Sequence, residues 1–284
     1  MERVLPMARD WSPRVHDEAA SLGGLATRPQ AAGIHRDAAP RALVRFKPAT
    51  PARLRLICLP YAGGNAVAFH RWGACLPDDV ELWSAQYRGR GYRFHETPFV
   101  HMSDMLDELE AAIAPLLDVP TVLFGHSMGA VLAFELTRRM MAKSAALPTH
   151  LFLSGRSAPR QGDAVAPVVV PDWSDAQLIQ SLHALAGTPG QVLADPGLRE
   201  HALLTLRADL TCLQGWRTRA EPALPVPITV FGGSDDPHAP AHSLDGWAQG
   251  TTQAFGKHVF QGGHFFIRDA YPGMIDLMLR TVRP

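Results

Sequence analysis

The sequence predicts an α/β fold with a mostly parallel sheet, helices on both faces and an inserted helical segment. Short apolar runs alternate along the chain with longer segments of helical character. Several of these runs, such as 54–59, 121–124 and 228–231, are almost wholly apolar. This composition is typical of strands buried on both sides, as in a parallel sheet covered by helices. In such sheets, functional groups gather at the C-terminal ends of the strands.

The alternation predicts the elements in order. Strands are expected near 42–46, 54–59, 81–87, 121–124, 150–154, 228–231 and 257–260. Helices are expected near 66–76, 103–117, 130–141, 241–248 and 270–282. Ser103 is the expected N-cap of the second of these helices, because acidic residues follow it in the first turns.

The rhythm of strands and helices breaks between residues 159 and 222. Two helical segments are expected there, near 175–186 and 195–216. Their apolar positions recur at helical spacing: Leu178, Ile179, Leu182 and Leu185, then Leu203, Leu206, Leu210 and Leu213. We expect a helical cap inserted at 159–222, although both stripes could instead pack directly on the core. The core would then comprise 41–158 and 223–284, and residues 1–40, which lack a sustained period, would form a flexible N-terminal arm.

Composition argues against several classes of protein. The 27 basic and 27 acidic residues cancel, and this balance argues against nucleic acid as the main partner. Three cysteines without C-x-x-C spacing favour reduced thiols in the cytoplasm over disulfides or a zinc site. No apolar run approaches the length of a membrane span, and no signal peptide is expected. Metal-ligand spacing and phosphate-binding glycine motifs are also absent from the sequence, so no metal or cofactor is expected.

The segment Gly125-His126-Ser127-Met128-Gly129 matches the pattern G-x-S-x-G. An apolar strand precedes it and a helix follows, which is the context of a nucleophile elbow. The glycines on either side of the serine let neighbouring backbone pass closely, where a Cβ atom would not fit. We therefore predict that Ser127 is a nucleophile at the edge of the sheet.

A serine hydroxyl needs a base within hydrogen-bond reach and a group that orients the base. In α/β-hydrolases these partners follow in the order Ser, Asp or Glu, His. His264 is the predicted base because it follows the last strand in a glycine loop, whereas His126 is expected to be structural. Asp236 is the predicted acid because Gly233-x-x-Asp236-x-x-x-Pro240 matches the spacing of the acid loop, and Asp235 remains the alternative.

Two backbone N–H groups are expected to stabilise the developing oxyanion. Met128 follows the nucleophile at a helix N-terminus. Ala62 lies in the loop after residues 54–59, directly before Gly63-Gly64. A tight glycine turn would also explain the two glycines.

With these motifs in place, the chain resembles the free-standing type II thioesterases of nonribosomal peptide and polyketide synthesis. The resemblance runs from about Leu43 to the C-terminus. It is carried by four core motifs and by two in the predicted cap: Leu59-Pro60-Tyr61-Ala62-Gly63-Gly64, Tyr87-Arg88-Gly89-Arg90-Gly91, Gly125-His126-Ser127-Met128-Gly129-Ala130, Gly262-Gly263-His264-Phe265-Phe266, Ala186-Gly187-Thr188-Pro189 and Leu206-Arg207-Ala208-Asp209.

The resemblance implies an α/β-hydrolase fold and hydrolysis of acyl or aminoacyl groups from the phosphopantetheine arm of an acyl-carrier or peptidyl-carrier protein. It implies Ser127 as nucleophile, His264 as base, Asp236 as orienter, and Ala62 and Met128 as the oxyanion hole. No membrane partner is expected, and we expect a monomer. The chain departs from the family in its longer N-terminal tail.

Other functions remain open at this point. A general esterase, a chain-releasing or cyclising thioesterase, and a non-catalytic module on the same fold are the alternatives. Arg88, Arg90 and Arg93 lie in a glycine loop near the expected entrance to the site. The simpler interpretation of these arginines is a solvated basic loop, and docking of an acidic carrier protein is the alternative.

Overall fold

The computed structural model describes residues 41–158, 173–184, 194–214 and 222–282. These residues belong to one unit, Ala38–Pro284. The predicted arm at 1–40 lies outside the described residues, as do parts of the predicted insertion, at 159–172, 185–193 and 215–221.

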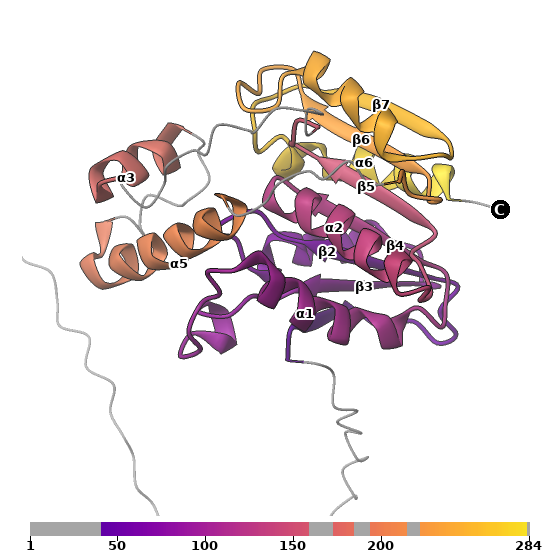
Figure 1. Cartoon of the computed structure of the whole chain (residues 1–284), viewed down its shortest axis with the longest axis horizontal. Helices are drawn as coiled ribbons and strands as arrows, with labels where there is room; N and C mark the ends of the chain where they lie inside the picture. The colour runs from indigo at the N-terminus through magenta and orange to yellow at the C-terminus, as the bar shows by residue number, and fades with distance from the viewer. Residues whose placement is uncertain (1–40, 159–172, 185–193, 215–221, 283–284) are drawn as a thin grey trace, which may run out of the picture. The chain divides into compact units, whose positions relative to one another are not determined.

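Among the described residues, seven strands form one sheet in the order β1-β3-β2-β4-β5-β6-β7 (Figure 1). The strands are β1 (Leu43–Lys47), β2 (Leu54–Leu59), β3 (Val80–Ala85), β4 (Thr121–His126), β5 (His150–Ser154), β6 (Ile228–Gly233) and β7 (Phe255–Phe260). Neighbouring strands are parallel, except that β1 pairs antiparallel with β3 at the edge. The predicted mostly parallel sheet is confirmed. Its C-terminal strand ends therefore meet at one edge.

Helices lie on both faces of this sheet. The described helices are α1 (Met102–Ile113), α2 (Met128–Ala142), α3 (Asp175–Ala184), α5 (Pro196–Gln214) and α6 (Ile267–Thr281), with 3₁₀ helices η1 (Ala66–Cys75), η2 (Gly91–Arg93), η3 (Ala114–Leu116) and η4 (Ala241–Gly250). One apolar cluster joins α1, α2 and η4 to one face, and a second joins η1 and α6 to the other. Alternate residues of each strand enter the two clusters. In β2, for example, Leu56 and Cys58 belong to the second and Ile57 and Leu59 to the first. In Figure 1, α1 and α2 lie in front of the sheet.

The helices expected at 66–76 and 241–248 are present, and both are 3₁₀ helices. Each buries a pair of large side chains three residues apart: Phe69 and Trp72 in η1, Leu244 and Trp247 in η4. Side chains at i and i+3 align along a 3₁₀ helix, so this geometry directs both members of each pair into the core. The apolar spacing alone does not distinguish it from an α-helix.

The predicted N-cap at Ser103 is wrong. The cap of α1 is His101, which makes no side-chain capping bond, and Ser103 lies in the first turn, where its Oγ donates to Asp104 Oδ1 at 3.1 Å. Burial of Met105, Leu106 and Leu109 against the sheet fixes where this helix begins. Tertiary packing therefore overrides the local capping preference.

His150 starts β5 in the interior of the sheet. It is 6% exposed, its Nε2 is hydrogen-bonded to Thr229 Oγ1 at 2.9 Å, and its ring stacks on Phe152 at 4.4 Å between centroids. Burial lowers the pKa of this imidazole to about 4. The folded chain therefore holds His150 neutral at a pH where the unfolded chain binds a proton.

The pKa of His150 makes a prediction about stability in acid. Below the unfolded pKa of 6.5 the unfolded state binds the extra proton, so the free energy of unfolding falls as the pH drops from about 6.5 to 4. A shift of this size corresponds to about 3 kcal/mol. His150→Gln should lose less stability than the wild type between pH 7 and pH 4, by roughly this amount. Urea unfolding at both pH values measures the difference, and parallel losses in the two proteins would contradict the prediction.

Candidate active site

Ser127 lies in a strained turn between β4 and α2. Its φ of 54° and ψ of −109° place a non-glycine residue in a sparsely populated region of backbone space. From Thr121 to Thr137, Ser127 is the one residue that is not buried. Its N–H donates to the Ser154 carbonyl at 2.8 Å, which ties the turn to the end of β5. The turn thus presents a single hydroxyl from an otherwise buried segment.

Glycines flank Ser127 because backbone meets backbone at both positions. A Cβ at Gly125 would lie 2.0 Å from the Gly129 carbonyl oxygen, and one at Gly129 would lie 1.9 Å from the Leu59 carbonyl oxygen. Neither distance is compatible with a side chain. The first turn of α2 therefore packs directly on the end of β2.

His264 and Asp236 form a buried hydrogen-bonded pair. His264 Nδ1 donates to Asp236 Oδ2 at 2.8 Å, and the two residues are 8% and 3% exposed. Burial alone would raise the pKa of Asp236, but His264 and the backbone N–H groups of His238 and Ala239 together outweigh it, and the pKa is lowered. Asp236 Oδ1 also accepts the His238 N–H at 2.9 Å. The carboxylate is therefore ionised and fixed, as a group that orients an imidazole must be.

Asp235, the alternative acid, has a different position. It is exposed, and its Oδ2 accepts the Ser234 hydroxyl at 2.8 Å. Its N–H donates to the Gly262 carbonyl at 2.9 Å and so joins the loops after β6 and β7. Gly233 permits the same approach, since a Cβ there would lie 2.5 Å from the Gly262 and Gly263 carbonyls.

His126 lies between the turn at Ser127 and the loop that carries His264. Its ring is fully buried, with the centroid 5.0 Å from that of His264, and its Nδ1 is 3.0 Å from Ser154 Oγ. Burial, with a smaller effect of His264, lowers the pKa of His126 well below its usual value. Gly155, at φ +59°, makes room for the ring, because a Cβ there would lie 2.5 Å from His126 Cε1. A neutral, buried imidazole thus packs between the turn and His264.

The loop after β2 lies beside this turn. Leu59 is paired in register with Gly125, since β2 and β4 are parallel neighbours. Within the loop, the Gly64 N–H donates to the Tyr61 carbonyl at 2.8 Å and the Gly63 N–H to Asp209 Oδ2 at 2.7 Å. Those two donors are engaged, whereas Met128 begins α2 and its N–H has no acceptor within the helix.

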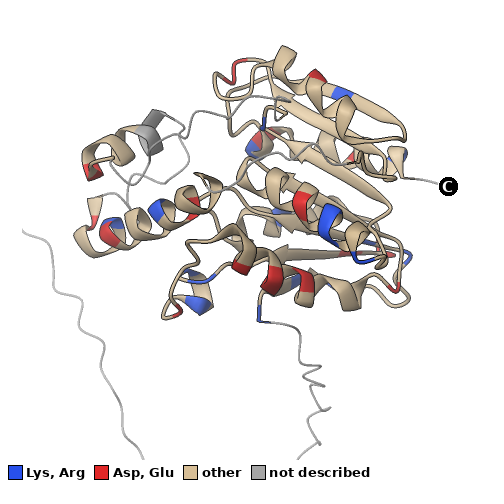
Figure 2. Ribbon diagram, in the orientation of Figure 1, with Lys and Arg blue, Asp and Glu red and all other residues tan. Residues whose placement is uncertain are grey.

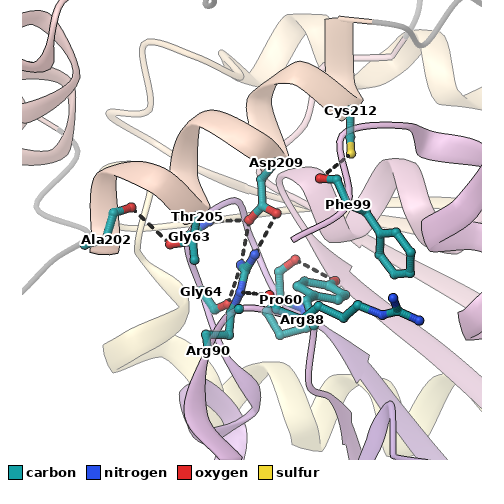
Figure 3. A network of polar contacts seen from close by, with 12 residues as sticks. Pro60, Gly63, Gly64, Arg88, Arg90, Phe99, Ala202, Thr205, Asp209 and Cys212 are labelled. Carbon is teal, nitrogen blue, oxygen red and sulfur yellow. Dashed lines mark hydrogen bonds and ion pairs between the residues drawn. The ribbon is translucent and has the colours of Figure 1, made fainter. Parts of the chain in front are cut away.

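Sequence analysis missed the role of Asp209 and Arg90. Asp209 lies on α5 and is fully buried, where it receives two bonds from the Arg90 guanidinium, at 2.6 and 2.8 Å (Figure 3). A signal was present in the sequence: Asp209 follows Leu206 by three residues and thus falls on the apolar stripe of the helix. A carboxylate at such a position indicates a buried cationic partner.

The described residues offer no group of three or more His, Cys, Asp or Glu side chains that could share a metal ion. Among the same residues, none of the helices combines the length and the apolarity that crossing a bilayer needs.

Comparison with known proteins identifies the family. A family model described as a thioesterase domain matches residues 54–281. The chain belongs to the thioesterase family. It is 37% identical over 235 residues to the gramicidin S biosynthesis protein GrsT of Aneurinibacillus migulanus, which covers 82% of this chain and 90% of that protein.

Two solved structures show the same architecture. The type II thioesterase BorB from the borrelidin biosynthetic cluster superposes with a TM-score of 0.74 at 36% identity, covering 84% of this chain and 98% of BorB. YbtT, a type II thioesterase from the yersiniabactin pathway, gives a TM-score of 0.75 at 26% identity, with 84% and 97% covered. The α/β-hydrolase fold expected from the resemblance is therefore confirmed for this thioesterase.

Two of the three arginines in this loop of the thioesterase, Arg90 and Arg93, are buried and are therefore not free to dock a partner. Arg93 is 2% exposed and pairs with Glu108 at 2.7 Å and Glu96 at 2.6 Å. Figure 2 shows that α1, which carries Glu108, bears several acidic residues. Burial would lower the pKa of Arg93, but these carboxylates outweigh it and the pKa is raised. The side chain of Arg88 is 38% exposed, lies 4.3 Å from the Phe99 ring centroid and also pairs with Glu108. Docking through Arg90 or Arg93 was the wrong hypothesis, because both are consumed in internal ion pairs.

The pair of aspartates after β6 gives a prediction for catalysis. Asp236→Asn should lower kcat for a small thioester by about 10⁴-fold, because an amide can hold the imidazole in the wrong tautomer. Asp235→Asn should leave kcat within about twofold, because the carboxylate is exposed and makes no bond to His264 among the described contacts. Steady-state hydrolysis of butyryl-N-acetylcysteamine measures both, and the reverse order of damage would assign the role to Asp235.

Proposed function

We propose that this thioesterase hydrolyses acyl or aminoacyl groups from the phosphopantetheine arm of carrier proteins and so clears misloaded synthases. In this proposal Ser127 is the nucleophile, His264 the base and Asp236 the residue that orients it. The backbone N–H groups of Ala62 and Met128 bind the oxyanion. The buried, hydrogen-bonded His264–Asp236 unit, on the same sheet edge as the strained turn at Ser127, is the observation that carries it.

The first step forms an acyl-enzyme. Ser127 Oγ attacks the thioester carbonyl while His264 Nε2 takes the hydroxyl proton, and Asp236 stabilises the imidazolium that forms. The negative charge on the carbonyl oxygen is held by two N–H groups, each typically worth roughly 2.7–4 kcal/mol. The C–S bond then breaks, and the pantetheine sulfur leaves as a thiol with the proton from His264.

The second step uses water. His264 accepts a proton from a water molecule that attacks the acyl-serine, and the oxyanion forms again at the same two donors. The C–O bond to Ser127 breaks, the proton returns to Oγ, and the carboxylic acid leaves. In sum, a thioester and water give an acid and a thiol.

The proposal extends to the organisation of the chain. Residues 41–158 and 223–284 would form the catalytic core, and 159–222 a helical cap. Support comes from α5, whose Leu206 lies 3.6 Å from the position that a Cβ at Gly63 would take, beside the proposed oxyanion loop. We also propose a cytoplasmic monomer. The free thiols Cys58, Cys75 and Cys212 support the cytoplasmic half of this proposal, since disulfides are rare in a reducing compartment.

The relatives favour this function over the alternatives. GrsT is a protein of gramicidin S biosynthesis, and BorB and YbtT are type II thioesterases of biosynthetic clusters. A general esterase would use the same three residues but would not need a carrier. The test of function must therefore compare acyl groups on a carrier with acyl groups on a small thiol.

The covalent step makes the first prediction of this proposal. Ser127→Ala should unfold near the wild-type temperature, because alanine keeps the Cβ and the backbone of the turn, and should lose at least about 10³-fold in kcat. A fluorophosphonate followed by peptide mass spectrometry should label Ser127 in the wild type and nothing in the variant. Labelling at another serine would reassign the nucleophile.

The carrier makes the second prediction. A short acyl chain contributes little binding, with each buried CH₂ worth about 0.8 kcal/mol. Recognition should therefore depend on the carrier and its pantetheine arm. The kcat/KM for butyryl-carrier should exceed that for butyryl-N-acetylcysteamine by at least about tenfold, equivalent to about 1.4 kcal/mol. Equal values for the two substrates would favour the general esterase.

A further inference from the structure

The loop after β2 is anchored at three points between its ends. The Pro60 carbonyl accepts the Tyr87 hydroxyl at 3.0 Å, the Gly63 N–H donates to Asp209 at 2.7 Å, and the Gly64 carbonyl accepts from Arg90 at 3.1 Å. These contacts come from the loop after β3 and from α5, and Figure 3 shows Arg90 and Asp209 reaching the Gly63-Gly64 backbone. The proposed oxyanion donor, Ala62, lies between the first anchor and the second.

Asp209 links α5 to two loops, the one after β2 and the one after β3. Its Oδ2 accepts from the Gly63 N–H and from Arg90, and its Oδ1 accepts a second bond from the same guanidinium. The fork is bidentate, a geometry that restricts rotation of both side chains. Asp209 is fully buried and the Arg90 side chain is 7% exposed, so water does not screen the pair.

Arg90 also fixes the backbone of the loop after β3. Its guanidinium bonds to Asp209 and to the Gly64 carbonyl. Its own carbonyl oxygen accepts a bond from Gln86 Nε2 at 2.9 Å, which holds the loop in place. Burial would lower the pKa of Arg90, but Asp209 outweighs it, and the pKa is raised. The cation is therefore permanent, and its backbone contact to Gly64 persists across the working range of pH.

We propose that the Asp209–Arg90 pair positions the oxyanion hole. The pair fixes the Gly63-Gly64 backbone, and with it the direction of the Ala62 N–H, relative to Ser127. This inference rests on the proposed function, since it deepens the role of the Ala62 donor. Asp209 and Arg90 are positioning residues here, because neither touches the reacting atoms. The oxyanion hole is therefore correctly formed only when α5 is in place on the core.

Stability alone does not account for the pair. Buried ion pairs are often replaced by apolar residues of similar volume at little or no cost in stability. Apolar side chains at these two positions could not accept the Gly63 N–H or donate to the Gly64 carbonyl. The double variant Arg90→Met/Asp209→Leu therefore separates the two roles, because it removes the bonds to the loop without leaving a charge buried alone.

The test compares this double variant and Asp209→Asn with the wild type. Both should lower kcat for butyryl-N-acetylcysteamine by about 10- to 100-fold, since a donor displaced by about 1 Å costs on this order. KM should stay within about twofold, because the displaced donor acts on the transition state. Butylboronic acid adds to the serine as a tetrahedral adduct, so its Kd should rise by the same factor as kcat falls. A melting curve verifies that each variant is folded.

Glu81→Gln is the matched control. Glu81 is also a buried carboxylate paired with an arginine, Arg55, at 2.6 Å. This pair lies near the N-terminal ends of β2 and β3, away from the site. This variant should change the melting temperature without changing kcat or the boronate Kd. A folded double variant with wild-type kcat and boronate affinity would overturn the positioning role. In that event, labelling of Ser127 in the wild type would still support the proposed function, whereas an unlabelled wild type would reject the function itself.

Discussion

Direct contact between backbones sets the geometry of this site. The first turn of α2 packs on the end of β2 at Gly129, and the strand before the turn packs on that same helix at Gly125, at distances that exclude any side chain. Peptide groups have few alternative conformations, so such a contact transmits the position of the sheet to the turn with little freedom. Ser127 can therefore be held in a conformation that is unfavourable for a serine, because the surrounding packing over-determines it.

The remaining parts of the site lie on loops, and each loop is fixed by a different means. The loops after β6 and β7 are joined through Gly233 and through backbone bonds such as Asp235 N–H to the Gly262 carbonyl. The loops after β2 and β3 depend on side chains instead, above all on Arg90 and Asp209. Among the described contacts, the proposed base and its acid are thus held by the core, whereas the loop that carries the proposed oxyanion donor is also bonded to α5. If the proposed roles hold, a displacement of α5 would therefore weaken transition-state stabilisation and leave the nucleophile in place.

Much of this could be predicted from the sequence, because the decisive signals are local. Apolar runs identify the strands of a parallel sheet, and G-x-S-x-G between a strand and a helix identifies the turn at Ser127. Sequence reasoning failed where long-range packing decides. It placed the start of α1 at Ser103, although burial of the helix sets the start, and it took Arg90 and Arg93 for loop charges because their partners lie as far away as Asp209, 119 residues along the chain. Glycine-rich composition predicts a loop there, but it does not reveal that Arg90 and Arg93 are buried.

The buried charges also explain why α5 carries an aspartate on an otherwise apolar stripe. Leu203, Leu206 and Leu210 belong to a small apolar cluster that reaches Ala62, so this part of the helix already has apolar surface to bury. An apolar residue in place of Asp209 would extend that surface. It would leave the Gly63 N–H and the Arg90 guanidinium without an acceptor in the interior, at a cost larger than the gain of one buried side chain. Apolar contacts tolerate small sliding movements, whereas a bidentate ion pair does not. A site that must place an N–H within a fraction of an ångström therefore needs the polar contact, and the apolar stripe supplies the affinity that keeps the helix there.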